Sequence, residues 1–209
     1  MLTLLAADFA PVTALASGAG RNVGRKKASA APGRVAAEAT VSETRMTEKT
    51  TIHFSLKMRD RWPRPLAAEW QATHPDLFDA DDLRLTHTQP EKHFYEWLAA
   101  IHLFHRDGAL SLIEKYGYAN HAHKVEQLDK ILGTDGAAFV RSLRSRHNVQ
   151  PPDLFVYVPG TSRLWFAEVK GPRDSVMPKQ ADSHSLLADH LGARVELISI
   201  REGIASAAR

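Results

Sequence analysis

Two carboxylates and a lysine stand at the ends of two β-rich runs that a Pro-Gly turn separates. Asp153 opens the first run, and Glu168 and Lys170 close the second. An antiparallel hairpin with its turn at 160–161 would pair Asp153 with Glu168, with Cβ atoms roughly 4.5–5.5 Å apart. Like charges placed opposite each other in this way repel. A divalent cation is the simplest group that would neutralise them, since carboxylate oxygens suit Mg²⁺ or Mn²⁺.

Side-chain alternation in the second run predicts that its glutamate and its lysine share one face. Residues 163–170 read as a strand, in which successive side chains point to opposite faces. Glu168 and Lys170 then lie together near the strand end, and Asp153 joins them if the hairpin register holds. A bound cation can acidify water and stabilise charge on a phosphate during in-line displacement. A neighbouring lysine can orient or deprotonate that water, and Gly171 would let a substrate backbone approach closely.

The elements around these residues predict a mixed sheet. Residues 153–158 and 163–170 form the hairpin, 178–191 read as a helix that ends at Gly192, and a final strand covers about 195–200. Because a helix connects the second hairpin strand to the last strand, these two strands are expected to pair in parallel. The predicted fold class is therefore α/β, with a mixed β-sheet flanked by helices and extra helices upstream.

The region before the hairpin is predicted to be mostly helical. Alternating apolar residues from Ile52 to Met58 predict a strand. Residues 60–90 contain several prolines and an acidic cluster, and they read as loop with one short helix. Periodic apolar positions predict helices over about 66–72, 90–105, 109–116, 122–132 and 136–146.

The chain is expected to divide into three parts. Residues 1–45 form a basic tail rich in Ala, Gly and Ser that is expected to be disordered. Residues 46–89 pack on the core as a strand and a Pro-rich region, and residues 90–205 form the main domain. The Arg-rich start also resembles an organelle transit peptide, and translation from Met46 is a further alternative. The chain has no cysteine and no apolar run of the roughly 18 residues that a spanning helix needs, so we expect a cytoplasmic protein of bacterial or phage type.

The pattern Pro-Asp, fourteen residues, Glu-x-Lys that runs through Asp153 to Lys170 resembles the PD-(D/E)XK nuclease superfamily. Gln180 in the following helix and the Gly-x-x-Val turn at 192–195 resemble its VRR-NUC branch. The resemblance implies a restriction-endonuclease-like αβα core that hydrolyses DNA with Mg²⁺ or Mn²⁺. It also implies a role in replication, repair or mobile-element processing, with flap or branched DNA among the substrates.

The same resemblance implies a role for each residue of the site. Asp153 and Glu168 would hold the metal, with the Val169 carbonyl as a further oxygen. Lys170 would position or activate water, and Gln180 would support the substrate or the lysine.

The family also carries a glutamate on a helix upstream of the sheet, which would complete the metal shell. Glu91 is the best match, because it starts an apolar stripe that continues at Phe94, Leu98 and Ile101. Glu96 is the alternative.

Four basic residues are candidates for contacts with backbone phosphates. Arg173 and Lys179 follow the motif lysine, and Arg141 and Arg144 precede the hairpin. Solvated surface positions are the alternative for all four. His184, one helical turn after the motif glutamine, either faces the site and touches a phosphate or packs under the sheet.

The charge of the chain does not by itself identify a polyanionic partner. Residues 1–50 carry seven Lys or Arg against four Asp or Glu, whereas residues 51–209 carry twenty of each, so the net charge of +3 lies in the N-terminal segment. A non-catalytic nucleic-acid-binding or scaffold module with the same fold is therefore the competing function. The oligomeric state is open, with a homodimer among the alternatives.

Overall fold

The hairpin predicted around the Pro-Gly turn is present in the computed structural model, which describes residues 48–118 and 120–203. Strands β3 (Leu154–Tyr157) and β4 (Leu164–Lys170) pair antiparallel, with Leu154 opposite Ala167. Gly160 in the turn has a φ of 73°, a conformation that glycine adopts without steric cost. This register is the predicted one, and its continuation by one residue places Asp153 opposite Glu168.

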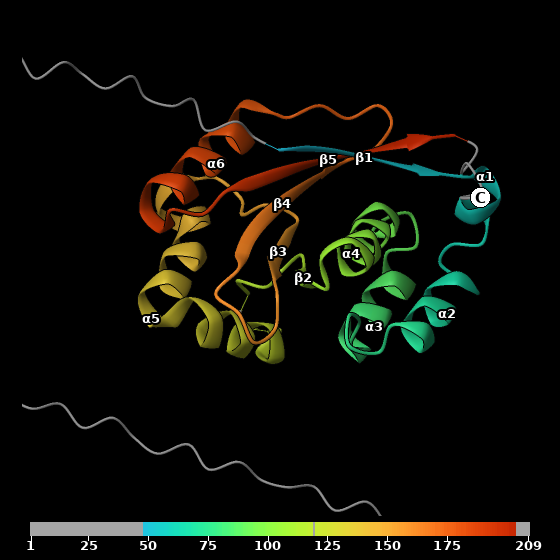
Figure 1. Ribbon diagram of the computed structural model, residues 1–209, viewed down its shortest axis with the longest axis horizontal. Helices are drawn as coiled ribbons and strands as arrows, with labels where there is room; N and C mark the ends of the chain where they lie inside the picture. The colour runs from blue at the N-terminus through green and yellow to red at the C-terminus, as the bar shows by residue number, and fades with distance from the viewer. Residues whose placement is uncertain (1–47, 119, 204–209) are drawn as a thin grey trace, which may run out of the picture. The chain divides into compact units, whose positions relative to one another are not determined.

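Five strands form one mixed sheet in the order β1-β5-β4-β3-β2, as Figure 1 shows. Strands β1 (Lys49–Phe54), β5 (Val195–Glu202) and β4 run parallel, and β2 (Leu110–Ile113) pairs antiparallel with β3. The parallel pairing of β4 with β5 confirms the prediction drawn from the helix between them. The tail predicted at 1–45 lies outside the described residues.

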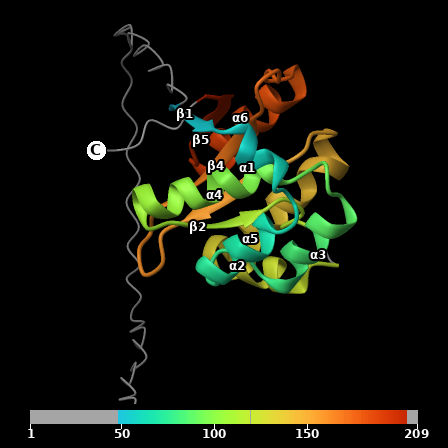
Figure 2. The ribbon, with the colours of Figure 1, turned by 90° about the vertical axis from the view of Figure 1, so that its right-hand side faces the viewer.

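Helices cover both faces of the sheet, which confirms the α/β class (Figures 1 and 2). Alternation along β4 sends Trp165 and Ala167 into the core that contains residues of α4 (Phe94–Asp107). The intervening Phe166 packs in the other core, with residues of α5 (Ala122–His147) and α6 (Pro178–Leu191). Within the described part of the chain, no helix is both long enough and apolar enough to cross a lipid bilayer.

The two helices predicted on either side of Gly133 are both present, and they meet at this residue in the kinked element α5. Gly133 has φ 70° and ψ 170°, which lies outside the helical region. Helix α6 begins at Pro178 and is followed by Gly192 with a φ of 63°, as predicted from the preference of proline for the first turn and of glycine for the position after the last.

Some predictions upstream of the hairpin are wrong. The segment predicted as a helix at 109–116 contains strand β2, because its backbone pairs with the hairpin edge that β3 leaves open. The first strand ends at Phe54, and Met58 lies in the short helix α1 (Leu56–Asp60) that the Ser55 hydroxyl caps. Helix α2 (Leu66–Thr73) confirms the short helix predicted in the Pro-rich region.

Helix α3 (Ala80–Thr88) was missed in that region because its acidic residues read as loop. The acids start the helix instead. Asp79 accepts a hydrogen bond from the Asp82 amide at 2.7 Å, and the Asp82 carboxylate accepts one from the Asp79 amide at 3.2 Å, an arrangement that satisfies two backbone donors of the first turn.

Candidate functional site

Asp153 and Glu168 meet at the open end of the hairpin, as predicted. Asp153 precedes β3, and its Oδ2 atom accepts a hydrogen bond from the Val169 amide at 2.8 Å. Glu168 is only 2% exposed. Burial raises the pKa of Asp153 well above its ordinary value, and the negative charges of Glu168 and Glu96 raise it further. Glu168 and Glu96 therefore lie close enough to Asp153 to disfavour its ionised form.

Lys170 and Gln180 join Glu168 in one hydrogen-bonded group. Lys170 Nζ lies 2.7 Å from Glu168 Oε1 and 2.9 Å from Gln180 Oε1. Gln180 Nε2 also donates to Glu168 Oε1. Gln180 is held in place by its position in the first turn of α6, where its Oε1 atom accepts from the Met177 amide at 2.9 Å. The lysine ammonium is thus fixed in direction rather than free to rotate in solvent.

The upstream glutamate near Asp153 is Glu96, so the preferred choice of Glu91 is corrected. Helix α4 begins at Phe94 rather than at 90, so Glu91 falls in the preceding turn, where it is exposed and its carbonyl accepts from Arg59. Glu96 lies in the first turn of the helix. Burial and the nearby charge of Glu114 raise its pKa to about 7.

Two residues of the site, Glu114 and His93, were not found from the sequence. Glu114 follows β2, and its Oε1 atom lies 3.3 Å from Nδ1 of His93, the residue before α4. Burial alone would raise the pKa of Glu114, but the hydrogen bond and charge of His93 outweigh it and hold this pKa below its ordinary value. Glu114 was missed because residues 109–116 were predicted as a helix. A strand there would have ended at the same sheet edge as Asp153.

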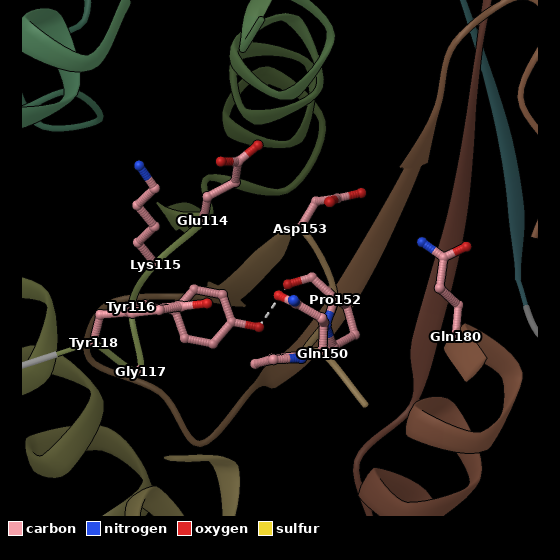
Figure 3. A pocket seen from close by; sticks show the side chains of 10 residues that line it. Glu114, Lys115, Tyr116, Gly117, Tyr118, Gln150, Pro152, Asp153 and Gln180 are labelled. Carbon is pink, nitrogen blue, oxygen red and sulfur yellow. Dashed lines mark hydrogen bonds between the residues drawn. The ribbon is translucent and has the colours of Figure 1, made fainter. Parts of the chain in front are cut away.

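A cavity of about 330 Å³ opens beside these acids. Figure 3 shows Glu114, Asp153 and Gln180 around it, together with Tyr116 and Tyr118. The Tyr116 hydroxyl donates a 2.7 Å hydrogen bond to the carbonyl of Pro152, which fixes the backbone directly before the aspartate. A small polar group in this cavity can therefore reach Asp153 and Glu114.

None of the four predicted basic residues lines this cavity, but two of them line an adjoining one. Arg141 and Arg144 on α5 line a second cavity of about 220 Å³ that shares Tyr118 with the first. Arg144 donates a 2.7 Å hydrogen bond to the Tyr118 hydroxyl. Arg173 lies in another exposed pocket beside Tyr95, and Lys179 is exposed on the first turn of α6.

Side chains of the protein itself fill the space beside Gly171. This corrects the prediction that a substrate backbone approaches there. A Cβ atom at this position would lie 2.9 Å from Cε2 of Tyr95 and 2.9 Å from Oδ2 of Asp174. The glycine is needed because the Tyr95 ring packs on the turn after β4.

His184 faces the site, which decides between its two predicted positions. Its Nε2 atom lies 3.5 Å from Glu168 Oε2, and it has no hydrogen-bond partner among the described residues. The glutamate is therefore approached by Lys170 and Gln180 on one oxygen and by the imidazole on the other.

A comparison of the chain with protein-family models gives no match, and a comparison with curated proteins gives none either.

The donor set fits a hard divalent cation. Asp153, Glu168, Glu96 and Glu114 supply carboxylate oxygens, the ligands preferred by Mg²⁺ and Mn²⁺. The Oε2 atom of Glu96 is buried and has no hydrogen-bond partner in the part of the chain that the structure describes. Buried polar atoms are normally paired, so an orphaned carboxylate oxygen among other acids is a place where a cation would be stabilising.

Proposed function

We propose that this protein is a metal-dependent nuclease that hydrolyses DNA phosphodiester bonds. The observation that carries the proposal is the convergence of Asp153, Glu168, Lys170 and Gln180, with Glu96 beside them, at one end of the hairpin. The motif spacing that resembles the PD-(D/E)XK superfamily and its VRR-NUC branch supports the same function. A mixed sheet with helices on both faces is compatible with the restriction-endonuclease-like αβα core that this resemblance implies.

Asp153, Glu168 and Glu96 would hold Mg²⁺ or Mn²⁺, with the Val169 carbonyl as a further candidate. When bound, such an ion acidifies water and stabilises charge on the phosphate. Like charge supplies the reason for binding, since Glu168 and Glu96 both raise the pKa of Asp153 and so disfavour its ionised form until a cation is present.

Lys170 is the residue placed to act on the attacking water. Its ammonium is held by Glu168 and Gln180 on two sides, and the residue is 9% exposed. The remaining N–H group therefore has a fixed direction and little contact with solvent. A fixed cation next to the reacting phosphate also offsets charge that develops in the transition state. Gln180 acts through this lysine and is a positioning residue.

The two adjoining cavities provide a path for a nucleic-acid strand. The first contains Asp153, and the second contains Arg141 and Arg144, with Tyr118 common to both. Arginine binds phosphate through its planar guanidinium, and an aromatic side chain offers a face on which a base can stack. A strand whose phosphate lies at the acids would therefore extend toward α5.

The proposal is tested with labelled linear, flap and four-way-junction DNA, and with RNA of the same sequence as a comparison. Incubation with Mn²⁺ should cleave at least one DNA substrate, and chelator should abolish the cleavage. Absence of cleavage on every substrate, at Mn²⁺ concentrations that saturate binding, would reject the enzymatic role.

A non-catalytic DNA-binding or scaffold module is a second candidate, favoured by the equal numbers of acidic and basic residues in 51–209. Nucleases act on a polyanion, and a neutral domain gains little from long-range attraction. Calorimetric titration with Mn²⁺ separates the two. Loss or weakening of a bound Mn²⁺ ion in the variant Asp153→Ala supports the enzyme, whereas DNA binding without any metal binding supports the module.

A further inference from the structure

A second group of metal-ligating side chains lies on the α4 and β2 side of the acidic cluster. His93, Glu96 and Glu114 each offer one ligand atom, and these atoms all lie within 4.8 Å of one another. They come from the residue before α4, the first turn of α4 and the residue after β2. The group borders Asp153, whose pKa the charges of Glu96 and Glu114 raise.

His93 is built into this group rather than exposed beside it. The residue is 4% exposed, and its Nδ1 atom lies 3.3 Å from Glu114 Oε1. Its Nε2 atom is buried and finds no hydrogen-bond partner among residues 48–118 and 120–203. Burying an imidazole in this way costs free energy because the ring loses its hydration, and one contact with a glutamate does not offset that cost. A cation bound by the ring would offset it.

Glu96 supplies the second orphaned atom. Its Oε2 is buried and lacks a partner in the described structure, while burial and the charge of Glu114 both oppose its ionisation. The two carboxylates and the imidazole lie close enough to bind one ion. One carboxylate oxygen and one ring nitrogen among them have no hydrogen-bond partner in the described part of the chain, so the three side chains form an incomplete ligand sphere.

The backbone that delivers two of these side chains is itself unusual. His93 has a φ of 69° and Glu114 a φ of 38°, values that are uncommon for residues with a Cβ atom. Conformations of this kind persist where surrounding structure enforces them and cluster at binding and catalytic sites. His93 and Glu114 both contribute a ligand atom to the same cluster. Their unusual backbone conformations are therefore associated with that cluster.

We infer that His93, Glu96 and Glu114 form a second cation site beside the proposed catalytic one, with a preference for a first-row transition-metal ion over Mg²⁺. The inference rests on the proposed function, because Glu96 would be shared between the two positions. An imidazole ligand gives the preference, since nitrogen donors suit transition metals whereas Mg²⁺ favours oxygen donors and bound water.

The test uses Mn²⁺ alone as the probe, on the full chain, with calorimetry for stoichiometry and pulsed electron paramagnetic resonance for the ligand type. The wild type should bind two Mn²⁺ ions, one of which shows coupling to the nitrogen of an imidazole. His93→Gly should bind one ion and lose the coupling. Glycine is chosen because it accepts the positive φ at this position, so loss of binding does not reflect added backbone strain.

His87→Ala is the matched control, because His87 is an exposed histidine of α3. It should leave stoichiometry and coupling unchanged. Glu114→Gln, which keeps side-chain size, should weaken the second ion roughly tenfold or more and serves as the readout if His93→Gly fails to fold. Asp153→Asn should weaken the other ion roughly tenfold or more while the nitrogen coupling persists.

One Mn²⁺ per chain without nitrogen coupling in the wild type would overturn the second site. So would a stoichiometry and coupling that remain unchanged in both His93→Gly and Glu114→Gln. DNA cleavage measured on the same preparations keeps the two ideas separate. Cleavage with a single bound ion leaves the proposed function standing, whereas two bound ions without cleavage of any DNA would uphold the second site and reject the nuclease.

Discussion

The Val169 amide donates a 2.8 Å hydrogen bond to Oδ2 of Asp153, which ties the residue before β3 to the strand that carries Glu168 and Lys170. The bond fixes one aspartate oxygen. It also stabilises the carboxylate against the nearby charges that disfavour it.

Asp153→Asn should keep this hydrogen bond, because the asparagine carbonyl can accept from the same amide, while it removes one of the clustered negative charges. In chelator, we expect the thermal midpoint to stay constant or rise by a few degrees, since relief of like-charge repulsion contributes about 0.2–1 kcal/mol. Mn²⁺ affinity should fall by roughly tenfold or more. Scanning calorimetry and titration check both effects, and a lower midpoint with unchanged Mn²⁺ affinity would contradict the charge argument.

The metal-free protein should lose stability as pH rises from about 4.5 to about 7. Glu96 has its pKa raised from 4.5 to about 7, so over this window the folded state binds more protons than the unfolded state, and ionisation favours unfolding. Urea unfolding in chelator at several pH values measures the slope. Glu96→Gln should flatten it, whereas an equal slope in that variant would assign the pH dependence to other groups.

Gln180→Ala should reduce cleavage through its effect on Lys170. The amide oxygen accepts from the lysine ammonium at 2.9 Å, so its loss lets the lysine turn away from the phosphate while the carboxylates remain. We expect a fall in kcat of about 10-fold to 100-fold with little change in Mn²⁺ affinity. The exposed Asp182→Ala on the same helix is the control, and equal losses in both variants would point to damage of α6 instead.

Arg144→Ala should weaken DNA binding and reduce the slope of log affinity against log salt by about 1, as expected for loss of one phosphate contact. Arg146→Ala is the matched control, because Arg146 is exposed on the same helix but is not part of either cavity. Fluorescence anisotropy at several salt concentrations measures both. Identical slopes for the two variants would mean that the α5 surface attracts DNA without a defined path.

Gly171→Ala should destabilise the fold by about 1–3 kcal/mol, because the added Cβ would lie 2.9 Å from the Tyr95 ring. Gly117→Ala provides the comparison, since a Cβ there would have its nearest neighbour at 3.7 Å, an ordinary contact distance. Chemical denaturation distinguishes them. If Gly171→Ala lost DNA affinity without losing stability, the glycine would serve the substrate rather than the packing of Tyr95.

The core of the site could be predicted from sequence because its signals are local. The turn at Gly160 and the alternation along β4 determine which residues pair, and that register places Asp153 opposite Glu168. Pro178 and Gly192 mark the ends of α6, so the position of Gln180 in the first turn of this helix follows from short-range rules as well.

The remainder of the site depends on contacts that no local pattern specifies. Four residues from Leu110 to Ile113 do not define a helical or a strand period, and pairing with β3 makes them a strand, which is why Glu114 was missed. The positive φ of His93 delays the start of α4 to Phe94, which moves the upstream acid from Glu91 to Glu96.

The role of Lys170 in metal-dependent DNA hydrolysis is tested most directly by single-turnover cleavage of labelled DNA. The wild type and Lys170→Ala are compared, with Mn²⁺ binding followed on the same samples. The exposed Lys130→Ala on α5 is the control. We predict Mn²⁺-dependent cleavage by the wild type and the control, and a loss of roughly 100-fold or more in Lys170→Ala with Mn²⁺ still bound. Cleavage by Lys170→Ala at the wild-type rate would contradict the proposed nuclease mechanism.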